Sequence, residues 1–276
     1  MKSKITAAVI ISDIHAGCQL GLCPPKVRLD EGGEYRPNKI QKILWSYWRE
    51  FWESAVPEFT NGLPYSIIIN GDAIDGMHHG STHQITHNLT DQGKIAFELL
   101  SPLIEKCEGR FYMVRGTEAH VGKSGQEEER LAKELGAIPN SYGQYARNEL
   151  WKEIGGSLVH ILHHIGSTSS ASYESTAVHA ELIASYVEAS RWNERPPDAI
   201  IRSHRHRYFE TRFATDKGTG RGVVTPGWQA KTPFAYKIAG GRQSRPQFGG
   251  VVLIESPSGE LYTRPYVKSM EREKPE

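Results

Sequence analysis

Histidine and aspartate residues recur along this sequence in short clusters of the kind that bind metal ions. In chain order the clusters are Asp13-Ile14-His15, Gly71-Asp72, Gly116-Thr117-Glu118-Ala119-His120, His163-His164 and His204-Arg205-His206. Mixed carboxylate and imidazole ligands suit zinc, manganese or iron, whereas magnesium and calcium prefer oxygen ligands alone. In a locally extended segment, residues two apart point the same way, so each Asp-x-His or His-x-His pair can direct both side chains at one ion.

Each cluster follows a short apolar run that predicts a buried strand. The predicted strands span Ala7 to Ile11, Ile67 to Ile69, Phe111 to Val114, Leu158 to Leu162, and Ala199 to Ile201. In open α/β sheets, functional groups collect just beyond the carboxyl ends of the strands. We therefore expect the clusters to share one crevice, although the sequence separates them.

Amphipathic helices are predicted between these strands. Apolar residues from Ile40 to Ala55 recur at helical spacing, and we expect Pro57 to end that helix. Further helices are predicted from about Thr90 to Cys107, from about Gln126 to Leu135, and from about Tyr173 to Trp192.

The last part of the sequence has a different pattern, in which alternating runs predict antiparallel strands separated by glycine and proline turns. These strands are expected at residues 208–213, 222–225, 250–254 and 261–266. Alternating strands and helices followed by a strand-rich stretch predict an α/β fold with two packed sheets flanked by helices. We expect a single domain over residues 1–268 and a flexible charged tail over residues 269–276.

The overall composition excludes several classes of protein. The 33 basic and 32 acidic residues leave a net charge of +1, so attraction to a phosphate group must be local rather than a property of the whole surface. No apolar run is long enough for a signal peptide or a membrane span. The three cysteines form no CxxC pair, which fits a reducing compartment. We expect a cytoplasmic protein that does not bind membranes.

The order of the clusters resembles the signature of the calcineurin-like metallophosphoesterases, which reads Asp-x-His, Gly-Asp-x-x-Asp, Gly-Asn-His, His, Gly-His-x-His. In this chain it appears as Asp13-Ile14-His15, Gly71-Asp72-Ala73-Ile74-Asp75, Gly116-Thr117-Glu118-Ala119-His120, His163 and Ser203-His204-Arg205-His206. The likeness covers residues from about 8 to 210. It implies a four-layer αββα sandwich of two mixed sheets flanked by helices, with the strand-rich tail in the second sheet.

The resemblance also implies a site for two divalent metal ions, which would be Mn, Zn or Fe. Carried over by position, the ligands of one ion are Asp13, His15 and His206, those of the other are His163 and His204, and Asp72 bridges the two. Two metal ions about 3.5–4 Å apart hold a bridging hydroxide that attacks the phosphorus atom of the substrate. The catalytic residues implied are Asp72 and the general acid His120.

The chain departs from the family signature at two points. The Asn-His pair is replaced by a longer segment, and either Thr117 or Glu118 takes the place of the asparagine ligand. We prefer Glu118 because its carboxylate is anionic. Ser203 stands where the family has glycine. In the doublet His163-His164 either residue can be the ligand, and we prefer His163 because it directly follows the strand.

Other residues are candidates for substrate binding. Arg205, His79 and His164 lie beside or between the predicted ligands, and a guanidinium can grip a phosphate through two parallel hydrogen bonds. Asp75 is expected to orient a metal ligand from behind. A mixture of aromatic and basic residues between Trp228 and Arg242 could stack a nucleobase.

The function favoured by these patterns is hydrolysis of phosphate esters. We expect phosphodiesters as substrates, and nucleic acid is one candidate among them. The alternatives are a phosphomonoesterase that acts on a nucleotide, a protein or a small metabolite, and a non-catalytic metal-binding scaffold. The segments Arg115 to His120 and Pro226 to Gln229 look most like those of phage and prophage members of the family. The oligomeric state is left open.

Overall fold

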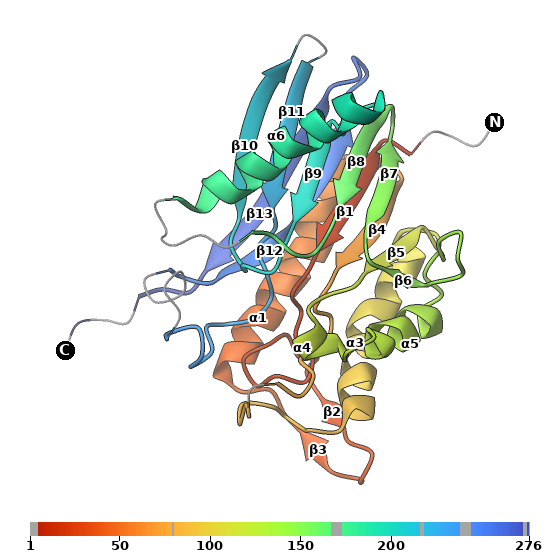
Figure 1. Ribbon diagram of the computed structural model, residues 1–276. Helices are drawn as coiled ribbons and strands as arrows, with labels where there is room; N and C mark the ends of the chain where they lie inside the picture. Colours follow the sequence, from red (N-terminus) through yellow and green to blue (C-terminus); the bar gives the residue numbers. More distant parts are fainter. Residues whose placement is uncertain are drawn as a thin grey trace.

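Two mixed β-sheets form the centre of the computed structural model, which describes residues 5–78, 80–166, 173–215, 218–237, 244–272 and 275 (Figure 1). The first sheet has the strand order β13-β12-β1-β4-β5-β6. Its strands are β1 (Ala7–Ile11), β4 (Tyr65–Asn70), β5 (Phe111–Val114), β6 (Ala146–Arg147), β12 (Gln247–Glu255) and β13 (Leu261–Ser269).

The second sheet has the strand order β10-β11-β9-β8-β7. Its strands are β7 (Leu150–Ile154), β8 (Ser157–Ile161), β9 (Ala199–Arg202), β10 (Phe209–Thr215) and β11 (Gly218–Val224). In the first sheet β1, β4 and β5 run parallel, and in the second β8, β9 and β11 run parallel. The carboxyl ends of the parallel strands within each sheet therefore lie together at one edge of that sheet.

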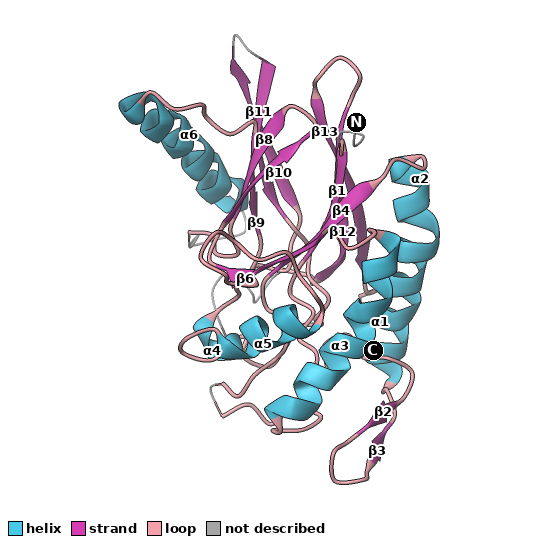
Figure 2. Ribbon diagram, turned by 90° about the vertical axis from the view of Figure 1, so that its right-hand side faces the viewer, coloured by secondary structure: helices cyan, strands magenta, loops and turns pink. Residues whose placement is uncertain are grey.

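Helices cover the outer face of each sheet, so the molecule has four layers (Figure 2). The first sheet is covered by α1 (Lys39–Glu50), a π-helical turn η1 (Phe51–Ala55), α2 (Val56–Thr60), α3 (Leu89–Lys106) and α5 (Gln126–Glu134). The second sheet is covered by α6 (Glu174–Trp192). This arrangement confirms the predicted α/β sandwich. None of the described helices is long and apolar enough to cross a membrane.

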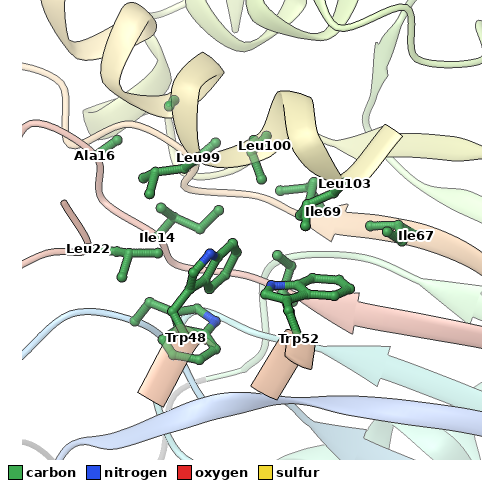
Figure 3. Close-up of a cluster of buried hydrophobic side chains, with 14 of the residues drawn as sticks. Ile14, Ala16, Leu22, Trp48, Trp52, Ile67, Ile69, Leu99, Leu100 and Leu103 are labelled. Carbon is green, nitrogen blue, oxygen red and sulfur yellow. The ribbon is translucent and has the colours of Figure 1, made fainter. Parts of the chain in front are cut away.

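Side chains on the first sheet alternate between two apolar cores, as the two-residue period of a strand requires. Ile67 and Ile69 of β4 face the helices, where Trp48, Trp52 and Leu99 complete the larger core (Figure 3). The intervening residues of the strands in this sheet, together with residues of the second sheet, form the layer between the sheets. That layer includes Ala8, Ile10, Ile68, Val159, Ile161, Ile201 and Val251. Because both faces are buried, these strands are continuous apolar runs.

Two predictions about the fold are wrong. Pro57 does not end the first helix, because the wider π-helical turn from Phe51 to Ala55 precedes it and Pro57 falls in the first turn of α2, where a missing N–H is tolerated. The strand-rich tail does not lie in one sheet. Strands β10 and β11 join the second sheet, but β12 pairs antiparallel with β1 and brings β13 into the first.

Candidate metal centre

The backbone at the ends of the central strands is held in an unusual conformation. Among the described residues, eight non-glycine residues have positive φ, and three of these belong to turns that follow helices. The other five are predicted ligands, namely Asp13 (φ 54°), His15 (φ 48°), Asp72 (φ 52°), His204 (φ 71°) and His206 (φ 52°). A left-handed conformation costs a residue with a Cβ roughly 1–2 kcal/mol, so such strain concentrates at functional sites.

These φ values show that the prediction of locally extended ligand pairs is wrong. Asp13 and His15 do converge, but not through an extended segment, because both residues have a left-handed backbone conformation. His204 and His206 are left-handed as well. The backbone turns sharply at each ligand, and hydrogen bonds from the amides of Asp13 and His15 to the carbonyls of Gly71 and Asp72 tie the two loops together.

The first ligand group consists of Asp13, His15 and His206, whose donor atoms lie within 4.8 Å of one another. The two imidazole Nε2 atoms are 3.2 Å apart, and His206 Nε2 lies 3.1 Å from Asp13 Oδ1. Asp13 Oδ1 is buried, and despite this proximity it makes no hydrogen bond with any described residue. Three possible metal-ligand atoms thus converge, and one of them, Asp13 Oδ1, lacks a hydrogen bond.

The second ligand group consists of Asp72, His163 and His204, which again lie within 4.8 Å of one another. His163 Nε2 is 3.1 Å from Asp72 Oδ2. The hydroxyl oxygen of Thr117 lies between them, at 3.2 Å from Asp72 Oδ2, 3.4 Å from His163 Nε2 and 3.1 Å from His204 Nδ1. Thr117 therefore occupies this group although it was not the preferred residue.

Asp72 stands between the two groups. Besides its place in the second group, it lies within 4.8 Å of donor atoms of His15 and His120. The loops around it leave no space for larger residues, since a Cβ added to Gly116 would overlap the Asp72 carboxylate, and one added to Gly71 would overlap the His163 ring. Both glycines are therefore required where they stand.

The donor set fits metal ions. Ligand atoms stand about 2.0–2.2 Å from a zinc ion, so two ligands of one ion are roughly 3.0–3.6 Å apart. The 3.1 and 3.2 Å contacts of the first group and the 3.1 Å contact between His163 and Asp72 fall in that range. The buried Asp13 Oδ1 with no hydrogen bond is the atom whose environment a cation would complete.

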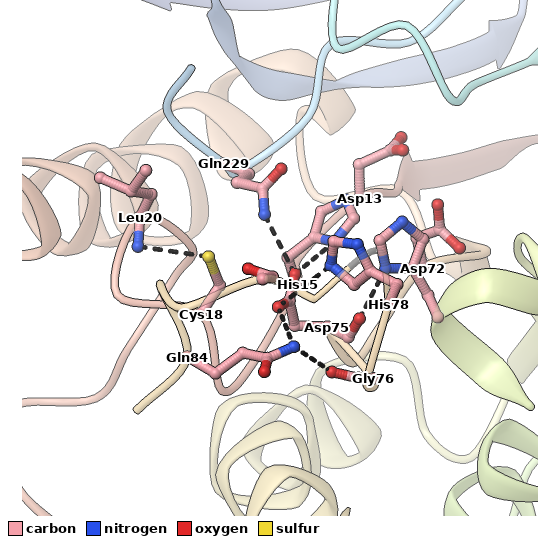
Figure 4. A network of polar contacts seen from close by, with 12 residues as sticks. Asp13, His15, Cys18, Leu20, Asp72, Asp75, Gly76, His78, Gln84 and Gln229 are labelled. Carbon is pink, nitrogen blue, oxygen red and sulfur yellow. Dashed lines mark hydrogen bonds and ion pairs between the residues drawn. The ribbon is translucent and has the colours of Figure 1, made fainter. Parts of the chain in front are cut away.

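Groups behind the histidines fix which ring nitrogen faces the centre. The Nδ1–H of His163 donates to the carbonyl of Asn70 over 2.6 Å, which leaves Nε2 for a metal. His15 Nδ1 faces Asp75 Oδ1 at 3.3 Å (Figure 4). Asp75 in turn accepts hydrogen bonds from the side-chain amides of Gln84 and Gln229. Asp75 therefore lies behind His15, and its orienting role stays a prediction.

The charges of the centre stabilise each other while no cation is present. Burial would raise the pKa of Asp13 and Asp72, but the facing histidines His206 and His163 hold the pKa of both carboxylates below its usual range. Burial would lower the pKa of His163, but Asp72 and then Asp13 raise it to about 10. The protonated histidines thus compensate the charges of Asp13 and Asp72, and bound metal ions would compensate the same two charges.

His120 lies beside the first group, with its ring centre 4.6 Å from that of His15. Its Nδ1–H donates to the carbonyl of Asp75 over 2.6 Å, so Nε2 is the nitrogen left for other partners. Burial, followed by the neighbouring His15, lowers the pKa of His120 to about 4. The ring is therefore neutral at pH 7 in the metal-free protein.

The structure does not bring every predicted site residue to the centre. Glu118 begins the short helix α4 (Glu118–Val121), is exposed, and belongs to neither ligand group. His164, which follows His163, is exposed, and the centre of its ring lies 5.4 Å from that of the His204 ring. Arg205 is partly buried near Glu174. His79 lies outside the described residues.

The aromatic and basic segment considered for base stacking divides into two parts. Trp228 is fully buried and packs edge-to-face on Trp48, with ring centres 4.9 Å apart, so it belongs to the core. Phe234 and Tyr236 are exposed. Among the aromatic residues in the described part of this segment, only these two are exposed, and Arg242 lies outside the described residues.

Glu128 was missed by the sequence analysis. It is fully buried on α5, and its two carboxylate oxygens accept hydrogen bonds from the amides of Ala73, at 2.8 Å, and Gly116, at 2.7 Å. These amides adjoin Asp72 and Thr117, so one carboxylate connects the two loops. Burial, followed by the charge of Asp72, raises the pKa of Glu128 to about 7. No local pattern could have found this residue, because only the fold brings it there.

Comparisons with known proteins give no family for this chain, since no family model and no curated protein matches it. Solved structures give low similarity. A predicted phosphoesterase from Streptococcus pneumoniae is 9% identical with a TM-score of 0.33, and 95% of this chain and 98% of that one are covered. Vps29 from Chaetomium thermophilum is 12% identical with a TM-score of 0.39 and 97% coverage of both chains.

The sulfate thiohydrolase SoxB from Thermus thermophilus is 12% identical with a TM-score of 0.40, and 96% of this chain but 57% of that one are covered. Similarity this low carries no argument about function. None of these proteins concerns the likeness to phage members, which stays a prediction.

Proposed function

We propose that this chain is a phosphoesterase that depends on two divalent metal ions. The observation that carries the proposal is the convergence of two ligand groups on the shared carboxylate of Asp72. When bound, the ions supply Lewis acidity and a nucleophile at neutral pH. Asp13, His15 and His206 would hold one ion, and His163, His204 and the Thr117 hydroxyl the other, with Asp72 between them.

The chain's own residues prepare the centre for this chemistry. Asp75 and the Asn70 carbonyl hold His15 and His163 with Nε2 facing inward, so these rings need no reorientation when metal binds. The backbone is left-handed at Asp13 and Asp72, and each carboxylate lies 3.1 Å from the Nε2 atom of a histidine of its own ligand group. Positioning of this kind lowers the reorganisation needed during the reaction.

We propose His120 as the proton donor to the leaving oxygen. Its Nδ1–H is committed to the Asp75 carbonyl, so Nε2 is the atom that can carry the transferred proton. A bound phosphate anion favours the protonated ring, because an opposite charge nearby raises the pKa of an imidazole. Glutamine at this position would keep a hydrogen-bonding group but could not carry the proton.

A diester fits the charges beside the centre better than a monoester does. A phosphomonoester carries about −1.5 to −2 charges at pH 7, whereas a diester carries one. Glu174 balances one of the two cationic side chains next to His206, since Arg207 Nη2 lies 3.0 Å from Glu174 Oε2 and Arg205 interacts electrostatically with the same carboxylate. These three side chains keep one net positive charge, which matches the single negative charge of a diester. We therefore propose phosphodiesters, including those of nucleic acid, as the substrate class.

The proposal is tested by metal analysis beside ester hydrolysis. Wild type supplied with Mn²⁺ should contain two ions per chain and cleave bis-p-nitrophenyl phosphate faster than p-nitrophenyl phosphate. Chelator should abolish turnover, and Mn²⁺ should restore it. Asp72→Asn should lose both metal and activity. Faster cleavage of the monoester would overturn the diester preference, and two bound ions with no hydrolysis of either ester would indicate a scaffold.

A further inference from the structure

A chain of buried polar side chains lies directly behind the ligand loops and joins the two sheets. Asn70 Nδ2 is 2.7 Å from Ser203 Oγ, which is 2.7 Å from Thr225 Oγ1. Thr225 Oγ1 is in turn 2.7 Å from Ser12 Oγ, which donates to the carbonyl of Pro226 over 3.3 Å. We call Asn70, Ser203, Thr225 and Ser12 the buried polar chain, and all four are fully buried.

The direction of its hydrogen bonds is fixed at one end. The amide nitrogen of Asn70 can only donate, so the Ser203 oxygen accepts and its own proton goes to Thr225. Thr225 has two acceptors, the Ser12 hydroxyl at 2.7 Å and the Arg202 carbonyl at 3.4 Å. In the order that uses the shorter contact, Thr225 donates to Ser12 and Ser12 donates to the Pro226 carbonyl. Each hydroxyl has a donor and an acceptor in this order, so loss of one hydroxyl breaks the sequence in the middle.

Members of the buried polar chain stand next to ligands in both sheets. Ser12 precedes Asp13 at the end of β1, and Ser203 precedes His204 after β9. Asn70 ends β4, two residues before Asp72, and its backbone carbonyl orients His163. The buried polar chain therefore crosses from the first sheet to the second between Asn70 and Ser203. It returns to the first sheet between Thr225 and Ser12.

This crossing matters because neither ligand group belongs to one sheet. The first group combines Asp13 and His15 with His206, and the second combines Asp72 with residues that follow β8 and β9. The distance between the sheets at this end thus sets the distances among the ligands. Apolar packing between the sheets is not directional, whereas hydrogen bonds of 2.7 Å tolerate little displacement.

We propose that the buried polar chain is a positioning device that fixes the spacing of the two ligand groups, with Ser203 as its central member. The inference rests on the proposed metal centre but not on the reaction. Ser203 stands where the family signature has glycine, which has no hydroxyl. This chain thus has a connection between its sheets that the signature residue could not make.

The test is Mn²⁺ binding by titration calorimetry on chelator-treated full-length protein. Ser203→Ala should weaken binding of at least one ion about 10–100-fold, the usual cost of losing a partner behind a ligand. Ser203→Gly, which is the family residue, should do the same. Thr225→Val should weaken binding, and Thr225→Ser should restore it because the hydroxyl is kept.

The matched control is Ser66→Ala on β4, the strand that carries Asn70. Ser66 is fully buried, and its hydroxyl has no hydrogen-bond partner among the described residues. It should bind Mn²⁺ like wild type. Wild-type affinity in both Ser203 variants would overturn the proposal, and so would equal weakening by Ser66→Ala. Wild type that binds two ions but hydrolyses no ester would refute the proposed function alone, whereas wild type that binds none would refute both.

Discussion

The layer between the sheets differs in chemistry between the middle of the strands and their carboxyl ends. In the middle of the strands the layer is apolar, with Ile10, Ile68 and Val159 fully buried and in regular strand conformation. At the carboxyl ends the buried groups are carboxylates and imidazoles, and the backbone at Asp13 and Asp72 is left-handed. Burial stabilises the first region and is costly in the second.

This difference teaches that the fold and the site are separable in their energetics. The apolar layer stabilises the native state without any ligand. The buried carboxylates of the centre depend instead on facing histidines and on hydrogen bonds from Thr117 and from the His204 amide. Substitutions in the two regions should therefore change different quantities.

Asp13→Asn should reduce ester hydrolysis by about 10³-fold or more, because it removes a charged ligand from the centre. Asparagine also accepts a left-handed conformation, so the backbone should not change. The circular dichroism spectrum should match wild type. Activity within tenfold of wild type in the presence of Mn²⁺ would contradict the role of this carboxylate.

Ile68→Ala should have the converse effect. It should lower the free energy of unfolding by about 2–5 kcal/mol, while the milder Ile68→Val costs about 0.5–1.5 kcal/mol. Under conditions in which the variants are folded, their turnover should equal that of wild type. Urea denaturation followed by circular dichroism measures the first quantity, and a tenfold loss of turnover in folded Ile68→Val would show that the two regions are not separable.

Glu128→Gln should lower both the free energy of unfolding and the affinity for metal, because Glu128 connects the loop of Ala73 to the loop of Gly116. Glutamine has one acceptor oxygen, so the amide of Ala73 or of Gly116 would lose its partner, at a cost of about 1–3 kcal/mol. Mn²⁺ affinity should fall about tenfold. A matched control is Glu127→Gln on the same helix, and equal effects of the two substitutions would argue against a role for Glu128.

The metal-free protein should lose stability as the pH rises from about 6.5 to about 10. The pKa of His163 is raised to about 10 in the folded state against about 6.5 in an unfolded chain, so its contribution is complete below the lower value and is lost as pH approaches the higher one. The raised pKa of His206 acts in the same direction. The melting temperature should therefore fall over this range in chelator and stay more nearly constant with Mn²⁺, and parallel curves would contradict the assignment.

The strands, the main helices and the convergence of the ligand clusters could be predicted from the sequence, because apolar period and strand ends are local properties. The position of Thr117 could not. It precedes the first residue of α4 and keeps its hydroxyl at the centre, while Glu118 begins the helix and faces solvent. Ligand preference favoured the carboxylate, but backbone geometry decides which side chain arrives.

Contacts between residues far apart in the chain could not be predicted from the sequence either. β12 is largely buried and pairs with β1, which lies more than 230 residues earlier in the sequence, rather than with the second sheet. Glu128 and Ser203 acquire their partners through contacts 55 and 133 residues away in the chain. Charge, size and period at one position do not specify such contacts.

The central claim is that two cations share Asp72, and anomalous scattering from crystals grown with Mn²⁺ tests it most directly. Two peaks about 3.5–4 Å apart are expected, one beside Asp13, His15 and His206 and the other beside His163 and His204, with the Asp72 carboxylate contacting both. A single peak, or two peaks that Asp72 does not join, would contradict the account.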